Sequence, residues 1–247
     1  MLSALRRLAG RMPAEPQAFP ADAPPETLYR FSLRGIELEL PRAILTEQLW
    51  LGFIHGYYES SEIAALAATI RAGDVVLELG AGVGFISSLM LKQLGARSVT
   101  AVEANPTLIP IIRRTHALNG VQAEVVQGVV AATDGEAGFY LQPAFFASSA
   151  MKLPNSEVVR LPAVGLSGLL ATARPDVMVV DIEGGEATLF EGVDLSGVRS
   201  LVVEMHEPHI GLAGIARCFA ALARGGFAYN PASGGTNVVF SRIGAPM

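Results

Sequence analysis

The fold of this chain is decided by the stretch Val75-Val76-Leu77-Glu78-Leu79-Gly80-Ala81-Gly82-Val83-Gly84-Phe85. Its first five residues predict a short buried strand, its three alternate glycines predict a tight turn, and the apolar run that begins at Phe85 predicts a helix. Such a turn directs backbone N–H groups and the helix N-terminus at one point, and glycine lets a ligand approach more closely than a Cβ would allow. The stretch therefore predicts a nucleotide-binding turn.

The glycine spacing and two acidic residues narrow the choice of ligand for this turn. A dinucleotide fingerprint reads Gly-x-Gly-x-x-Gly, whereas the third glycine here is Gly84 and Phe85 follows it. Glu78 stands just before the turn, where a carboxylate disfavours a pyrophosphate and suits a cationic ligand such as S-adenosylmethionine. The next expected strand, 98–102, runs into Glu103, which is placed to accept hydrogen bonds from ribose hydroxyls.

Two segments resemble the first two motifs of class I methyltransferases. They are Glu78-Leu79-Gly80-Ala81-Gly82-Val83-Gly84 and Val102-Glu103-Ala104-Asn105. This resemblance implies an α/β, Rossmann-like fold: a seven-stranded, mostly parallel sheet with an antiparallel last strand and helices on both faces.

Three further motifs resemble those of FkbM-type methyltransferases: Tyr57-Tyr58-Glu59, Asp181-Ile182-Glu183-Gly184-Gly185-Glu186, and Glu204-Met205-His206. The resemblance extends over about residues 57–242. One departure is Glu78, because members of this family often have Asp there, and the negative charge is kept. The resemblance implies S-adenosylmethionine as the cofactor, S-adenosylhomocysteine as its product, and methyl transfer to oxygen, often a hydroxyl of a sugar or natural product.

The expected site combines the turn with the ends of the later strands. Strands over 176–182 and 198–205 would bring Asp181, Glu183 and His206 to one rim. We expect these three to be catalytic, with Glu183 or His206 as the general base and Asp181 orienting the cofactor or the substrate hydroxyl. Glu186 is expected to start a helix. The expected cofactor-binding residues are Tyr58, Glu59, Glu78, Gly80, Ala81, Gly82, Gly84, Phe85, Glu103, Ala104, Asn105, Gly128, Val129 and Asp181.

Composition and charge exclude several classes of partner. The net charge of −5 and the lack of a Lys/Arg stripe argue against a nucleic-acid partner. No apolar run reaches the length of about 18 residues that a membrane span needs, so a soluble protein is expected. The single cysteine, Cys218, rules out an intramolecular disulfide and favours the cytoplasm. Asp181, Glu183, Glu204 and His206 are residue types that bind divalent cations, which leaves a metal site open as an alternative. No tight ligand spacing such as His-x-x-x-His supports it, so no metal site is expected.

The chain divides into two unequal parts. Residues 1–30 are expected to form an N-terminal helix and a proline-rich arm, because five prolines fall between Pro13 and Pro25. Residues 31–247 would form the methyltransferase domain, with an antiparallel excursion over 135–163 near the substrate site. The arm and the exposed sheet edges are compatible with a homodimer.

Three functions stay open on the sequence alone. The first is methylation of a hydroxyl oxygen on a small molecule. The second is methylation of an amine nitrogen, which needs less help from a base. The third is a non-catalytic subunit that binds S-adenosylmethionine and docks to partners through its arm.

Overall fold

The computed structural model describes residues 18–141 and 157–245, so the helix expected over residues 1–12 and the middle of the excursion lie outside the described residues. The strands are β1 Leu28–Leu33, β2 Ile36–Pro41, β3 Val75–Leu79, β4 Ser98–Glu103, β5 Glu124–Gln127, β6 Val129–Ala131, β7 Gly135–Leu141, β8 Glu157–Gly165, β9 Val177–Val180, β10 Ser200–Glu204, β11 Phe227–Gly234 and β12 Asn237–Arg242. The helices are α2 Glu47–His55, α3 Ser60–Thr69, α4 Phe85–Leu89, α5 Ile109–Asn119, α6 Leu166–Ala173, α7 Glu186–Leu189 and α8 Glu207–Arg224. The described residues also include a 3₁₀ turn over Arg42–Ile44 and a π-helical turn over Met90–Leu94.

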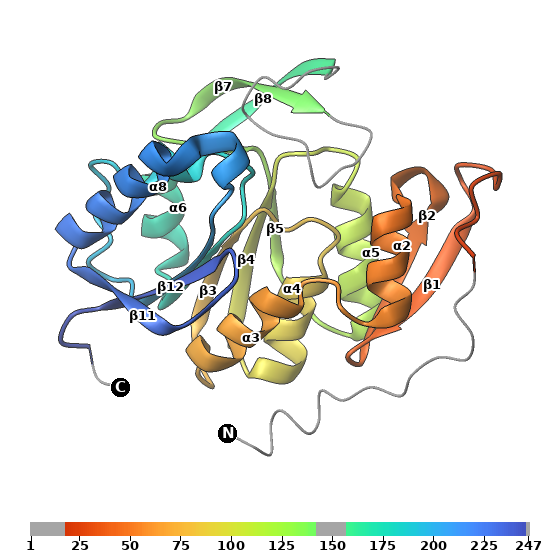
Figure 1. Ribbon diagram of the computed structural model, residues 1–247, viewed down its shortest axis with the longest axis horizontal. Coiled ribbons are helices and arrows are strands. Elements are labelled where there is room, and N and C mark those ends of the chain that lie inside the picture. Colours follow the sequence, from red (N-terminus) through yellow and green to blue (C-terminus); the bar gives the residue numbers. More distant parts are fainter. Residues whose placement is uncertain (1–17, 142–156, 246–247) are drawn as a thin grey trace.

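The central sheet has seven strands in the order β11-β12-β10-β9-β3-β4-β5 (Figure 1). β12 is antiparallel to both β10 and β11, and the other neighbouring pairs are parallel. The predicted fold class, including the antiparallel last strand, is therefore confirmed. The chain runs outward from β3 to one edge and later continues from β9 toward the other edge, so the strand order reverses between β3 and β9.

Both faces of the sheet are covered, which explains why its strands are apolar at nearly every position. One face, including Val76, Ala101 and Val179, packs against the first helices and the β1–β2 hairpin. The alternate residues, including Leu77, Met178 and Val203, pack against α6, α7 and α8. Cys218 of α8 is fully buried in this second layer. Consecutive residues of one strand thus pack into two separate cores, one on each face of the sheet.

The β1–β2 hairpin is fastened to α5 by polar contacts. The partly buried Glu39 of β2 accepts hydrogen bonds from Arg30 and from Arg114 of α5. Asn119 at the end of α5 exchanges hydrogen bonds with the Glu37 backbone. β1 begins at Leu28, before the predicted domain boundary between residues 30 and 31. The end of the predicted arm is therefore part of this hairpin.

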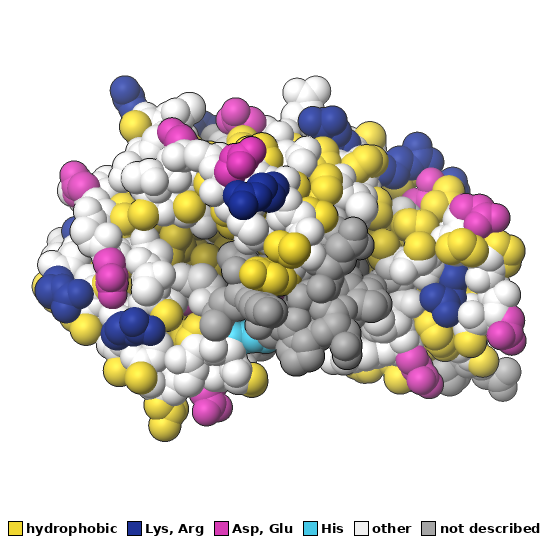
Figure 2. All heavy atoms as spheres, turned by 90° about the horizontal axis from the view of Figure 1, so that it is seen from above, with side chains coloured by type: hydrophobic (Ala, Val, Ile, Leu, Met, Phe, Trp, Pro, Cys, Tyr) yellow, Lys and Arg dark blue, Asp and Glu magenta, His cyan; other side chains and the backbone are white. Residues whose placement is uncertain are grey.

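The excursion forms a small sheet of its own. β8 pairs antiparallel with β7 and parallel with β6, and Figure 1 shows β7 and β8 crossing beyond one end of the central strands. Figure 2 looks down on this side of the molecule and shows acidic and basic side chains interspersed rather than gathered by sign. None of the described helices combines the length and hydropathy that a bilayer crossing requires.

Candidate functional site

The glycine turn after β3 is fixed between the ends of two neighbouring strands. The backbone N–H groups of Gly80 and Ala81 donate to the Val102 carbonyl at 2.9 and 3.1 Å. Gly80 has a φ of +91°, and a Cβ at this position would lie 1.7 Å from the Asp181 carbonyl oxygen. Only glycine fits here, because the conformation is left-handed and backbone fills the space that a side chain needs.

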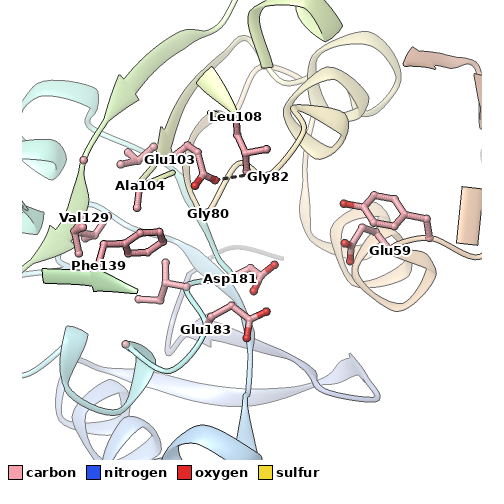
Figure 3. Close-up of a pocket in the computed structure, with 16 residues that line it drawn as sticks. Glu59, Gly80, Gly82, Glu103, Ala104, Leu108, Val129, Phe139, Asp181 and Glu183 are labelled. Carbon is pink, nitrogen blue, oxygen red and sulfur yellow. Dashed lines mark hydrogen bonds between the residues drawn. The ribbon is translucent and has the colours of Figure 1, made fainter. Parts of the chain in front are cut away.

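A cavity of about 760 Å³, including its open mouth, lies at the carboxyl end of the sheet where the strand order reverses. This is where open α/β sheets bind ligands. Figure 3 shows Glu59 on one side of the cavity and Phe139 on the other. Between them, Glu103 lies above and Asp181 and Glu183 lie below in this view.

The cavity brings together most of the residues predicted from the sequence. The predicted residues that line it are Tyr58, Glu59, Gly80, Gly82, Glu103, Ala104, Gly128, Val129, Asp181 and Glu183. Other lining residues were not named as binding residues from the sequence. Val102, Ile182 and Gly185 stand within the quoted motifs, and Val130 lies in the stretch 127–131 that was expected near the adenine, whereas Leu108 and Phe139 were not assigned to the cofactor. Phe139 lies in the excursion over 135–163, and the expectation that this excursion stands near the substrate was the signal that pointed to Phe139.

Four predicted cofactor-binding residues shape the turn from behind and do not line the cavity. Ala81 is buried, and Phe85 is buried with its ring against Tyr58 at 5.6 Å between centroids. A Cβ on Gly84 would lie 3.1 Å from Ile112 Cα, so this glycine serves helix packing. Asn105 is buried and donates its backbone N–H to Glu103. Their contribution to the site is therefore indirect.

Glu103 ties the end of β4 to the glycine turn. Its carboxylate accepts hydrogen bonds from Gly82 N at 2.9 Å and from Asn105 N at 2.7 Å. Burial raises the pKa of Glu103 to about 7, although these backbone N–H groups oppose the rise. Glu103 therefore holds the turn in shape while it lines the cavity.

Glu78 does not lie where the charge argument predicted. It is 1% exposed and is absent from the cavity lining, and neither carboxylate oxygen has a hydrogen-bond partner among the described residues. Alternate residues of a strand share a face, so Glu78 points with Val76 into the layer that contains α4. Burial raises its pKa to about 8, against a smaller opposing effect of the nearby Ser87. Its predicted contact with a cofactor has no support in this geometry.

The three predicted catalytic side chains meet at one end of the cavity. His206, which precedes α8, directs Nε2 toward Asp181 Oδ1 and Glu183 Oε2, each 3.4 Å away. Its other nitrogen, Nδ1, lies 2.8 Å from Glu186 Oε1. His206 itself is not among the lining residues, so it reaches the cavity only through the two acids.

Burial and mutual repulsion shift the pKa values of these acids upward. Burial, with the Glu204 and Glu59 charges, raises the pKa of Asp181 well above its ordinary value. Burial raises the pKa of Glu183 to about 7 even though His206 lowers it. Burial alone would lower the pKa of His206, but the hydrogen bond to Glu186 and the charges of Asp181 and Glu183 outweigh this effect and raise it to about 9. At neutral pH the imidazole is therefore protonated.

Two of the acids at the cavity have left-handed backbones. Glu59 has a φ of 51° and Glu183 a φ of 50°, which are costly conformations for residues with a Cβ. Backbone strain of this kind concentrates at functional sites. The cost supports a role for both carboxylates that packing alone would not require.

Asp181, Glu204 and His206 each offer one atom within 4.8 Å of the others, and these are ligand types that bind divalent cations. We interpret His206 as paired with acids, because its Nε2 lies 3.4 Å from a carboxylate oxygen of Asp181 and of Glu183. Glu204 also accepts a hydrogen bond from Thr236 Oγ1 at 2.8 Å, so one of its oxygens already has a partner. The lack of a metal site stays a prediction.

Comparisons with known proteins point to one family. Residues 78–227 match the family model described as the methyltransferase FkbM domain. The ribosomal RNA small subunit methyltransferase A of Magnetococcus marinus is 51% identical over 51 residues, which are 21% of this chain. The matched stretch spans 17% of that protein's length, so the likeness is local.

Solved structures give more distant likenesses. M. jannaschii TYW2 in complex with AdoMet is 15% identical, with 88% of each chain covered and a TM-score of 0.48. The ribosomal protein L11 methylase of Lactobacillus delbrueckii subsp. bulgaricus is 15% identical, with 76% of this chain and 78% of that chain covered and a TM-score of 0.43. These likenesses carry no information on substrate.

Gly80→Ala is expected to weaken binding of S-adenosylhomocysteine more than tenfold, because a Cβ would collide with the Asp181 carbonyl 1.7 Å away. Calorimetric titration measures the affinity. Gly120→Ala is the matched control, since Gly120 also has a positive φ but has nothing within 4 Å of a new Cβ. It should cost about 1 kcal/mol of stability and leave the affinity unchanged. Wild-type affinity in Gly80→Ala would contradict the assigned role of the turn.

Glu78→Gln is expected to change how stability depends on pH. Between the ordinary pKa of 4.5 and the folded value of about 8, the folded chain keeps a proton that the unfolded chain releases. The free energy of unfolding therefore falls as pH rises through this window. In Glu78→Gln the free energy of unfolding should fall less with pH, and near pH 8 it should exceed that of the wild type by about 1 kcal/mol or more. Urea unfolding across the window tests this, with the exposed Glu26→Gln as control; equal pH slopes in wild type and Glu78→Gln would refute it.

Proposed function

The chain belongs to the FkbM methyltransferase family, and on that premise we propose that it transfers the methyl group of S-adenosylmethionine to a hydroxyl oxygen of a small molecule. S-Adenosylmethionine is the cofactor of this family, and it supplies an electrophilic methyl group on a positively charged sulfur. The net charge of −5 favours a small molecule over a nucleic acid as the acceptor.

The residues of the cavity fit this cofactor. The glycine turn leaves room for close approach at Gly80 and Gly82, and Glu103 is an acidic residue on the wall at the end of β4. Glu59, Asp181 and Glu183 line the cavity, and a bound cation would favour their ionised forms and be attracted by them. The glycine cradle and the acidic walls match a nucleoside that carries positive charge.

The observation that carries the proposal is the placement of Glu183. This carboxylate lines the cavity, and its pKa of about 7 lets it accept a proton near neutral pH. His206 is the weaker candidate, because it does not line the cavity and its pKa of about 9 keeps it protonated. Glu183 is therefore the proposed general base, and Asp181 the residue that orients the hydroxyl or the cofactor.

The proposed step is an in-line displacement. Glu183 takes the hydroxyl proton while the oxygen lone pair forms the new bond to the methyl carbon. The bond from that carbon to sulfur breaks, and its electrons stay on the sulfur, which becomes neutral. Holding the hydroxyl in line contributes up to about 7–11 kcal/mol in favourable cases, so the walls of the cavity matter as much as the base.

Amine methylation is the second candidate. The carboxylates of Glu59, Asp181, Glu183 and Glu204 gather around a single protonated His206, and this excess of negative charge would attract an ammonium substrate. A neutral amine carries its own lone pair, so its methylation depends less on Glu183. Retention of most activity in Glu183→Gln would favour an amine.

The proposal is tested by turnover with labelled S-adenosylmethionine. Candidate acceptors are panels of sugars, glycosides and hydroxylated aromatic compounds, with primary amines as the contrasting panel. Release of S-adenosylhomocysteine measures turnover, and the carbon chemical shift of the transferred methyl distinguishes oxygen from nitrogen. Tight binding of S-adenosylhomocysteine with no turnover on any acceptor would favour a non-catalytic subunit.

Glu183→Gln is expected to lower kcat about 10²–10⁴-fold, because the glutamine amide cannot accept the proton. The affinity for S-adenosylhomocysteine should stay within a few fold of the wild type. In the wild type, kcat should rise with pH and level off above about 7, as Glu183 becomes ionised. The exposed Glu207→Gln serves as control. A wild-type kcat in Glu183→Gln would remove Glu183 as the base.

A further inference from the structure

The carboxyl group of Glu186 is the most deeply buried charge at this end of the cavity. The residue is fully buried at the start of α7, and the sequence analysis assigned it only to the beginning of a helix. Its two oxygens lie 3.2 and 3.0 Å from the Gly184 backbone nitrogen, and Oε1 also lies 2.8 Å from His206 Nδ1. A cap on α7 explains the contact with Gly184. It does not explain the contact with a ring that follows β10.

The contact with Glu186 fixes which edge of the His206 ring faces the acids. With Nδ1 bound to Glu186, Nε2 is the nitrogen left for Asp181 and Glu183. Hydrogen-bonding one ring nitrogen to a buried carboxylate is the usual way in which proteins fix the orientation and proton of an imidazole. Glu186 thus contacts His206, which faces the proposed base, and its charge also raises the pKa of Glu183.

We propose that Glu186 is a positioning residue, which holds the His206 imidazole so that its Nε2 edge faces Asp181 and Glu183 and keeps the proposed base ready to accept a proton. This inference rests on the proposed function, with Glu183 as the base. Glu186 takes no part in the bonds that form or break. Its main effect on catalysis passes through the position of His206, which Glu186 contacts at 2.8 Å.

The charges around His206 come from several elements. Glu186 is the first residue of α7, and Asp181 and Glu183 follow β9. Glu59 directly precedes α3, and the His206 charge lowers its pKa. The ring of His209, in the first turn of α8, lies 6.0 Å from that of His206 between centroids, and its Nε2 lies 3.4 Å from Glu183 Oε2. Glu204 at the end of β10 raises the pKa of both Asp181 and Glu183. Among these groups, the His206 charge is the one that opposes the upward shift of Glu183.

The direction of the effect follows from these signs. The imidazolium of His206 lowers the pKa of Glu183 and so favours its ionised, proton-accepting form. Removing the Glu186 charge removes a hydrogen bond that favours the protonated ring. His206 then gives up its proton at lower pH. Removing the Glu186 charge also removes a repulsion that raises the pKa of Glu183, so the two effects on Glu183 oppose each other. The loss of activity is therefore expected from the displaced ring, and the change in proton binding is expected at His206.

Glu186→Gln tests the inference, because glutamine keeps the size of the side chain and an oxygen for the Gly184 cap. We expect the His206 imidazole, followed by NMR in the substrate-free protein, to titrate about one pH unit lower or more in the variant. We expect kcat to fall about tenfold, because the ring is no longer held with Nε2 toward Asp181 and Glu183. Binding of S-adenosylhomocysteine should be unchanged. Glu191→Gln, an exposed acid just beyond α7, is the matched control and should change none of these.

A double-mutant cycle separates positioning from support of the fold. If Glu186 acts through His206, then Glu186→Gln in a His206→Asn background should lower kcat no further than His206→Asn alone. Independent losses that multiply, or an unshifted titration of His206 in Glu186→Gln, would overturn the proposal. If Glu186→Gln fails to fold, Glu186→Asp provides the same readouts, because it keeps the charge but shortens the reach to the ring. Since the NMR titration needs no acceptor, it decides the inference even if the proposed methyl transfer is wrong.

Discussion

The close contact between the ends of β3 and β9 is the constraint on which the site depends. Asp181 N donates to the Leu79 carbonyl at 2.8 Å, so the parallel pairing of the two strands continues up to the turn. Gly80 then passes so near the Asp181 carbonyl that no side chain fits between them. Because this contact lies where the strand order reverses, it sets the glycine turn beside Asp181, the first of the carboxylates proposed to take part in the reaction. The other walls of the cavity are built around that junction.

Concentrating carboxylates at this junction opposes folding. Glu59, Glu62, Asp181 and Glu183 all have raised pKa values, chiefly because burial disfavours their charged forms, and each lies in the field of the others. Within the described residues, the raised pKa of His206 shows the opposite response, a cation favoured by its neighbours. An arrangement that costs stability and is not relieved by ordinary pairing is typical of a functional site. A cationic ligand would offset part of this cost when it binds.

The sequence predicted the parts of the structure that depend on local pattern. Val75–Phe85 carries its own strand, turn and helix signals, and Asp181, Glu183 and His206 follow apolar strands whose ends had to meet at one edge. The order of the strands came from the family resemblance, because no local signal encodes it. Lining residues such as Leu108 and Phe139 could not be predicted, since an apolar residue that faces a cavity looks the same in a sequence as one that faces the core.

Glu78 and Glu186 show why a charge in a motif does not reveal its partner. Glu78 stands next to the glycine turn in sequence, but the alternation of the strand turns it into the layer of α4, away from the cavity. Glu186 looked like a helix-starting residue, yet the pairing of β9 with β10 brings the segment after each strand together and places His206 on its carboxylate. In both cases the arrangement of the sheet decides what the carboxylate contacts. The face of the strand determines the environment of Glu78, and the neighbouring strand determines the partner of Glu186, so the role of each acid follows from topology rather than from its distance along the chain.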